Sequence, residues 1–360
     1  MAKRLVVCCD GTWNVANQRY RTNVAKVAEA VRPVSADGTE QRVSYLDGVG
    51  TKWSEKLRGG ALGWGLSEKV RQAYQFLVKN YEPGDELYFF GFSRGAYTAR
   101  SLAGLVRNSG ILRPEHAGLL QEAWDLYRDR GKAPNDPPSV RFREAHSHEA
   151  KIRFVGVWDT VGSLGIPVPG PRMLKPLAIW VNRRWAFHDT TLSTWVQGAF
   201  HALAIDEKRR AFEPTLWHQQ PDAVRKGQEL KQVWFSGVHV DVGGGYKDTA
   251  LSDLGLLWMV AKAVEYDLEF DTAALGTGEF RPLGELHNSR TKLYRLTRPL
   301  HRPVGRAENP EDHHLDGLEY LAGSAKKRYD EFSPPYRPPK LVKYLKELGT
   351  DHIEPTDPPD

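Results

Sequence analysis

The sequence predicts an α/β protein built on a doubly wound, mostly parallel sheet. Short apolar segments alternate with stretches of helical periodicity, as in chains of βαβ units. The apolar segments run into acidic or glycine-rich turns, and the functional groups of such sheets gather at the carboxyl ends of the strands. The expected strands cover residues 4–9, 43–46, 86–91, 152–158, 232–238 and 293–296, and the expected helices cover 66–81, 94–106 and 251–264.

Length and composition indicate a globular chain with a sizeable core. The 360 residues are 40% hydrophobic and 26% charged, which excludes collagen-like, coiled-coil and wholly disordered chains. The most apolar stretch, residues 254–264, contains Lys262 and is far shorter than the roughly 20 residues of a membrane-spanning helix. The first residues carry no apolar signal region, so we expect a cytoplasmic protein, with export by a machine that reads no such signal left open.

Charge and cysteine usage restrict the partners further. The net charge of +5 is spread over many sites, without the dense basic run interleaved with aromatics that nucleic-acid binding favours. We therefore expect no nucleic-acid partner, while weak, transient attraction to an anionic membrane surface is compatible with this charge. Cys8 and Cys9 are neighbours on an expected strand and should point to opposite faces, so no disulfide is expected.

The domain organisation is expected to be one unit over residues 1–332 with a cap inserted around 162–200, and a loose tail rich in proline and charge over 333–360. Within the cap, residues 179–187 hold two tryptophans beside two arginines. This segment could be a lid that meets a lipid interface. The favoured interpretation is a cap helix that packs its aromatic residues on the core. Either a lid or a cap helix could cover the substrate.

The segment 91–95 reads Gly-Phe-Ser-Arg-Gly, which matches the G-x-S-x-G pattern. An expected strand precedes it and a helix rich in small residues follows, the context in which a strained serine projects above the sheet. The two glycines suit a turn where neighbouring backbone leaves no room for a Cβ atom. Ser93 is therefore the candidate nucleophile.

Four segments in order resemble the α/β-hydrolase domain of the type VI secretion lipase effectors, first family. They are residues 7–14 (VCCDGTWN), 91–100 (GFSRGAYTAR), 157–162 (VWDTVG) and 233–246 (VWFSGVHVDVGGGY). The resemblance spans roughly residues 4–300. It implies the α/β-hydrolase fold and a serine esterase with a Ser-Asp-His triad, with phospholipase activity in the secreted members and an acyl ester or phospholipid as substrate.

Two assignments of the acid and the base are open. Asp159 and Asp241 each follow an expected strand; the first would use His239 as base, the second His287 in a late loop. The fold commonly has a late-loop histidine, and similar family members carry a Leu-His-(Asp)-Ser block at 286–289, so we expect the triad Ser93, Asp241 and His287. His239 and Asp159 would then lie close behind the site. Asp206, another acid, lies in a charged helix-like segment, which favours a surface or salt-bridge role for it.

Two backbone N–H groups should stabilise the oxyanion. That of Arg94, directly after the nucleophile, is one candidate, and Gly11 and Thr12 after the first strand are expected to supply the other. Asp10 equally fits a simple turn in which its carboxylate caps the loop.

Two other function classes remain. A metal-dependent phosphohydrolase could use acids and a histidine at strand ends: Asp10, Asp47, Asp159, Asp241 and His239. That reading leaves the serine turn without a purpose. A non-catalytic binding module on the same fold is the third class. We expect the serine hydrolase, which needs no metal and no cofactor.

Overall fold

The computed structural model describes residues 2–11, 14, 18–48, 61–129, 131–161, 190–278, 281–290, 294, 298–305 and 318–356, with only the backbone of 61–64. Its centre is an eight-stranded sheet of order β10-β9-β8-β7-β6-β3-β1-β2 in which every neighbouring pair is parallel. This confirms the expected doubly wound sheet. The strands are β1 (Arg4–Cys9), β2 (Gln41–Leu46), β3 (Glu86–Phe92), β6 (Ile152–Trp158), β7 (Val196–Ala204), β8 (Glu229–Phe235), β9 (Glu319–Ala322) and β10 (Ile353–Glu354).

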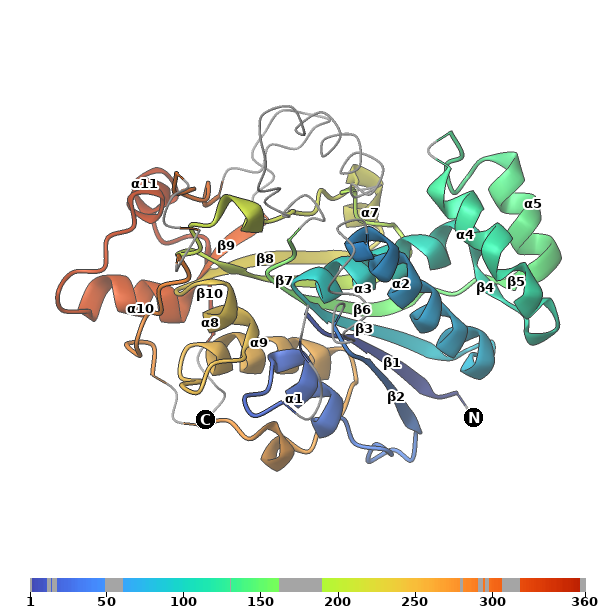
Figure 1. Cartoon of the computed structure of the whole chain (residues 1–360), viewed down its shortest axis with the longest axis horizontal. Helices are drawn as coiled ribbons and strands as arrows, with labels where there is room; N and C mark the ends of the chain where they lie inside the picture. Colours follow the sequence, from blue (N-terminus) through green and yellow to red (C-terminus); the bar gives the residue numbers. More distant parts are fainter. Residues whose placement is uncertain are drawn as a thin grey trace.

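Helices cover both faces of this sheet (Figure 1). One face carries α1 (Asn23–Ala30), α9 (Ser252–Glu265) and, near the β9 edge, α10 (Gly323–Glu331) and α11 (Pro339–Leu348). The other carries α2 (Ala61–Asn80), α3 (Arg94–Ser109), α4 (Leu120–Arg128) and α5 (Pro137–His146). The small sheet of β4 (Ile111–Leu112) and β5 (Ser147–His148), with α4 and α5, extends the molecule beyond α3 (Figure 1). The remaining short helices α7 (Pro221–Arg225) and α8 (His239–Gly243) flank β8 in the chain.

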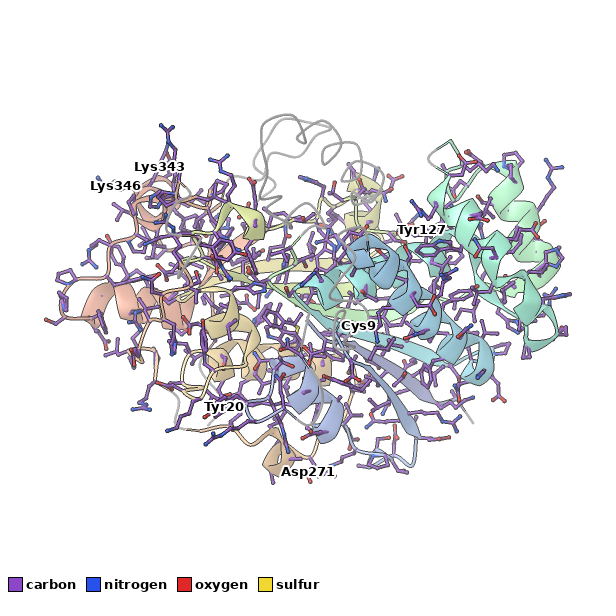
Figure 2. All side chains as sticks on the ribbon, viewed as in Figure 1. Cys9, Tyr20, Tyr127, Asp271, Lys343 and Lys346 are labelled. Carbon is purple, nitrogen blue, oxygen red and sulfur yellow. The ribbon has the colours of Figure 1, made fainter. Side chains whose placement is uncertain are left out.

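Strand β1 divides the interior into two cores. Val6 and Cys8 belong to the apolar cluster under α1 and α9, whereas Leu5, Val7 and Cys9 belong to the cluster under α2 and α3. Both cysteines are buried and free, and Figure 2 labels Cys9 on its strand. The expectation that they face opposite ways is confirmed, since successive residues of a strand alternate between faces.

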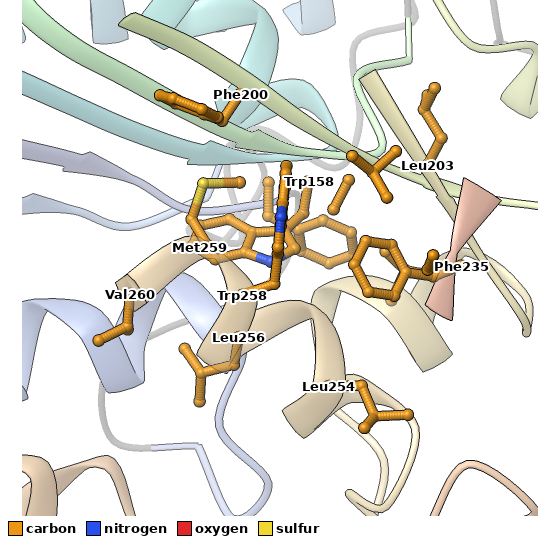
Figure 3. Packing of buried hydrophobic residues seen from close by; sticks show 14 of the residues in the cluster. Trp158, Phe200, Leu203, Phe235, Leu254, Leu256, Trp258, Met259 and Val260 are labelled. Atoms are coloured by element: carbon orange, nitrogen blue, oxygen red, sulfur yellow. The ribbon is translucent and has the colours of Figure 1, made fainter. Parts of the chain in front are cut away.

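Between β6 and α9, Trp158 and Trp258 lie among aliphatic and aromatic residues of the first cluster (Figure 3). Both rings are nearly or fully buried, and the Trp158 Nε1–H donates to the carbonyl of Gly255 at 3.1 Å. A Cβ at Gly255 would be 3.8 Å from the Trp158 ring, an ordinary contact. This packing fixes the end of β6, and therefore the position of the next residue, Asp159.

One expectation about the elements needs correction, and another falls largely outside the described residues. Strand β7 occupies residues 196–204, so the end of the region assigned to a cap at 162–200 is a central strand instead. Residues 162–189, with the tryptophan and arginine segment, lie outside the described residues. The strand expected at 293–296 also lies outside them except for Tyr294, which is not part of the sheet.

The C-terminal residues are part of the packed domain rather than a loose tail. Helix α11 buries Leu341 and Tyr344 against the first cluster, and β10 pairs with β9 at the sheet edge. Lys343 and Lys346, on the other side of α11, are exposed (Figure 2). The alternation matches a surface helix with one buried stripe. None of the helices in the described ranges combines the length and apolar character needed to cross a membrane.

Candidate active site

Ser93 occupies a sharp turn between β3 and α3. Its φ of 59° is in the left-handed region, where a side chain is strained, and its exposed fraction is only 7%. A Cβ on Gly91 would lie 2.5 Å from the Gly95 carbonyl oxygen, and one on Gly95 would lie 2.0 Å from the Cys9 carbonyl oxygen. Both positions therefore require glycine, as the turn pattern predicts.

His239 lies next to this serine. It is the first residue of α8, directly beyond the turn that follows β8, and its Nε2 is 2.8 Å from Ser93 Oγ. Its Nδ1 is 2.5 Å from Asp159 Oδ2. The imidazole is buried between the rings of Phe92 and Phe212, with centroids 4.6 and 4.8 Å away. One histidine thus connects a serine hydroxyl to a carboxylate, the arrangement of a charge-stabilised general base.

Asp159 follows β6 and is fully buried. Its Oδ1 accepts hydrogen bonds from the Ala204 N–H at 3.0 Å and from Arg302 Nη1 at 2.6 Å, and its Oδ2 accepts from Arg302 Nη2 at 3.0 Å. Burial alone would raise the pKa of this carboxyl, but the Arg302 guanidinium and the His239 hydrogen bond outweigh it and hold the pKa well below its usual range. Asp159 is consequently ionised at neutral pH.

Two environmental effects compete at His239. Burial lowers its pKa, while the hydrogen bond and negative charge of Asp159 raise it, and the net direction is downward. A neutral imidazole is therefore favoured at pH 7, with the unprotonated nitrogen available to the serine hydroxyl. His201, on β7, is neutral too, because burial lowers its pKa to about 3; its Nε2 accepts from the Thr160 N–H at 3.0 Å and so holds the residue after Asp159.

The expected triad of Ser93, Asp241 and His287 is not what the structure assembles. Asp241 and His287 bind each other, with His287 Nδ1 2.6 Å from Asp241 Oδ1, and the serine hydroxyl is bonded to His239 instead. Asp241 is the third residue of α8, within its first turn, and its carboxylate also accepts from the Val238 N–H, so it caps the start of the helix. Its pKa is raised by burial.

A second carboxylate ties the same loop to α8. Glu207, fully buried, accepts from Ser289 Oγ at 2.9 Å and from the His239 backbone N–H at 3.3 Å, and it pairs with Arg209 at 2.8 Å. The segment 286–289 therefore holds α8 in place through two acids. Asp206 is half-buried and engaged within the fold instead of being a solvated surface acid, because its Oδ2 accepts from the Gly237 N–H and the Tyr336 hydroxyl.

The first strand-end loop lies against the nucleophile. A Cβ on Gly11 would be 3.3 Å from Ser93 Cβ, so this backbone approaches the serine closely. However, the Gly11 N–H donates to Asp10 Oδ1 at 2.6 Å and so is already engaged. Asp10 also accepts from Thr22 and Tyr45, which is the turn-capping role. Burial raises its pKa.

The other two oxyanion candidates are the backbone N–H groups of Arg94 and Thr12. The Arg94 backbone N–H begins α3, where the first amides of a helix have no intrahelical acceptor. Thr12 lies outside the described residues.

The strand-end acids are directed to different protein partners. Asp10 faces hydroxyl groups, Asp159 faces Arg302, and Asp241 faces His287. Within the described ranges, three or more His, Cys, Asp or Glu side chains are nowhere placed to hold one metal ion. The chemistry that this geometry favours is proton transfer from a hydroxyl to an imidazole.

Arg302 is a site residue that the sequence reasoning did not single out. It is fully buried and touches both Asp159 oxygens, as well as the carbonyls of Ala204 and Phe212. The sequence around it, His-Arg-Pro, has no periodicity or spacing that marks a buried ion pair.

The parallel sheet and the serine on a strand-turn-helix define the class of the α/β hydrolases. A family model described as "T6SS, Phospholipase effector Tle1-like, catalytic domain" matches residues 3–262. The chain belongs to this family, which confirms the resemblance and the hydrolase class.

The individual relatives have low sequence identity to this chain. The chain is 28% identical over 243 residues to the uncharacterized protein YEL023C of Saccharomyces cerevisiae, covering 61% of this chain but 33% of that protein. A crystal structure of an uncharacterized protein from Pseudomonas aeruginosa is 18% identical with a TM-score of 0.44, covering 76% of this chain and 47% of the other. The Tle1 effector bound to the VgrG spike of the type 6 secretion system is 20% identical with a TM-score of 0.34, covering 69% and 51%. The chain thus spans about half or less of the length of these relatives.

Proposed function

We propose that the chain is a serine carboxylic-ester hydrolase in which Ser93, His239 and Asp159 act as nucleophile, base and acid. The observation that carries the proposal is the continuous connection from Ser93 Oγ to His239 Nε2 at 2.8 Å and from His239 Nδ1 to Asp159 Oδ2 at 2.5 Å. This triad replaces the expected assignment of Asp241 as acid and His287 as base. Those two residues bind each other, and the Ser93 hydroxyl is bonded to His239.

The reaction proceeds by two acyl transfers. Ser93 Oγ attacks the ester carbonyl carbon as its proton passes to His239 Nε2, and the resulting imidazolium is stabilised by ionised Asp159. The same proton passes to the departing alkoxide when the ester C–O bond breaks. Water, deprotonated by His239, then attacks the acyl carbon of the acyl-enzyme. As the bond from that carbon to Ser93 Oγ breaks, His239 returns the proton to Oγ and the carboxylic acid is released. The donor to the oxyanion in this proposal is the Arg94 backbone N–H, at the first position of α3.

The substrate we propose is an acyl ester with a lipid character. Membership of a family of phospholipase effector catalytic domains supports a phospholipid. The pI of about 9.0 is compatible with transient contact with an anionic membrane surface.

A fluorophosphonate probe tests the proposal, because it reacts with activated serines. The probe should label wild-type protein at Ser93 and fail to label S93A, and turnover of p-nitrophenyl butyrate should be lost in S93A and H239A. Chelator should leave turnover unchanged. Activity that survives in S93A but is abolished by chelator would instead indicate the metal-dependent phosphohydrolase, and no labelling with no turnover of soluble or phospholipid esters would indicate a binding module.

A further inference from the structure

We propose that Arg302 is a positioning residue of this site, holding the Asp159 carboxylate ionised and turned toward His239. The inference rests on the proposed function and adds a residue that lies outside the span matched by the family model.

The contacts of Arg302 fix both oxygens of the acid. Nη1 donates to Oδ1 of Asp159 at 2.6 Å and Nη2 donates to Oδ2 at 3.0 Å, the two-point grip that a planar guanidinium makes with a carboxylate. Nη1 also donates to the Ala204 carbonyl and Nη2 to the Phe212 carbonyl, and these two bonds anchor the guanidinium itself. Both charged side chains have no exposed surface. Rotation of the carboxylate away from His239 would therefore break a buried ion pair.

No other permanent cation in the described residues pairs with Asp159. The titratable groups that face it are His239 from α8 and His201 from β7, and burial lowers the pKa of each. Glu207 and Arg209, which lie beside His239, pair with each other. A fully buried carboxyl without a counter-charge takes up a proton, and a protonated acid no longer stabilises an imidazolium.

The location of Arg302 carries a second consequence. The match to the family model ends at residue 262, whereas the counter-charge of Asp159 comes from the segment 298–305. The His287 and Ser289 contacts that hold α8 also come from beyond that point. The hydrolytic unit therefore includes the later part of the chain.

The pH profile of kcat/KM for p-nitrophenyl butyrate tests the role. In R302Q, kcat should fall by roughly 10-fold or more and the acid limb should move to higher pH. The acid limb moves to higher pH whether Asp159 stays ionised or becomes protonated in the variant. If Asp159 stays ionised, its uncompensated negative charge raises the pKa of His239. If Asp159 is protonated, it must lose that proton before it can stabilise the imidazolium. R302K keeps the charge and should keep the limb at the wild-type pH.

The matched control is R328Q. Arg328 is equally buried and donates to the carbonyls of Pro282 and Gly284, without touching the triad. It should lose stability without a shift of the acid limb. A lowered kcat in R302Q with an unmoved limb would show a packing role only and overturn the proposal, as would wild-type behaviour.

If R302Q does not fold, the D159N/R302Q pair avoids the uncompensated charge. Because Arg302 is proposed to act through Asp159, the double variant should have the activity of D159N alone, and a further 10-fold loss would overturn the inference. Failure of the proposed function can be distinguished from failure of this inference. If the proposed function is wrong, S93A or D159N retains full activity, whatever the effect of changing Arg302.

Discussion

Asp241 and His287 form a hydrogen-bonded pair that resembles an acid–base dyad but does not join the hydrogen bonds that link Ser93, His239 and Asp159. Their 2.6 Å contact joins α8 to the loop at 286–289, and Tyr246 stacks on the imidazole with ring centroids 4.0 Å apart. Asp241 is only two residues from His239 in sequence. The pair therefore acts on the site through the position of α8.

The two histidines should consequently respond differently to replacement by alanine. H239A should lose about 10³-fold or more of kcat, because the base is removed. H287A should lose less than about 10-fold and lower the free energy of unfolding by about 1–3 kcal/mol, since Asp241 stays buried without its partner. Ester turnover and urea unfolding measure the two effects. E285A, at an exposed position just before this segment, is the control and should match wild type in both; near-total loss of activity in H287A would restore His287 as the base.

The pH dependence should follow the lowered pKa of His239. The acid limb of kcat/KM should fall below the ordinary histidine value of about 6.5, because burial outweighs the attraction of Asp159. A pH series with p-nitrophenyl butyrate measures it, and a limb above 6.5 would contradict the burial argument.

Stability should depend on Asp159 at low pH. Its pKa is lowered in the folded state, so the unfolded state binds the proton more readily, and folding stability falls as the pH falls. The contribution is fully present above the unfolded value of about 3.9 and is lost progressively below it. Urea unfolding of wild type and D159N between pH 6 and pH 3 should show a shallower pH dependence in the variant. Equal slopes would mean that other carboxyl groups dominate.

The turn glycine Gly95 should tolerate no side chain. In G95A the added Cβ would lie 2.0 Å from the Cys9 carbonyl oxygen, which is backbone and cannot rotate away. We expect a loss of about 3 kcal/mol or more in unfolding free energy together with loss of probe labelling at Ser93. G118A is the matched control, because a Cβ there meets nothing within 4 Å. A G95A protein as stable as G118A would mean that α3 shifts freely against β1.

The C-terminal helix should be an integral part of the fold. Leu341 is fully buried, so L341A should lower the unfolding free energy by about 2–5 kcal/mol, whereas K343A on the exposed side of α11 should change it by less than about 0.5 kcal/mol. Thermal melts and urea titrations of the two variants provide the comparison. Similar stabilities would support a loosely attached tail.

Local patterns were sufficient for much of the fold. The strand at residues 4–9 and the turn around Ser93 were predictable because each depends on neighbouring residues: a continuous apolar run, and two glycines around one serine. Strand β7 was not, because it is rich in alanine and glycine instead of the β-branched residues that mark strands. Gly198 has a tertiary reason, since its missing Cβ makes room for the Tyr266 ring.

The base could not be chosen from the sequence for a related reason. Asp159 and Asp241 both follow strands, and a histidine was available to each. The choice depends on which imidazole can contact both Asp159, after β6, and Ser93, after β3. That is decided by the order of the strands in the sheet, which the sequence does not give. Arg302 depends still more on tertiary structure, because its partner lies 143 positions away.

The adjacent thiols of Cys8 and Cys9 give the molecule a pair of built-in reporters, one for each layer of helices. A maleimide can reach Cys8 only when the layer containing α1 and α9 opens, and Cys9 only when the layer containing α2 and α3 opens. Peptide mapping that tells the two sulfurs apart would then reveal which side of the sheet detaches first under denaturant, with no engineered label.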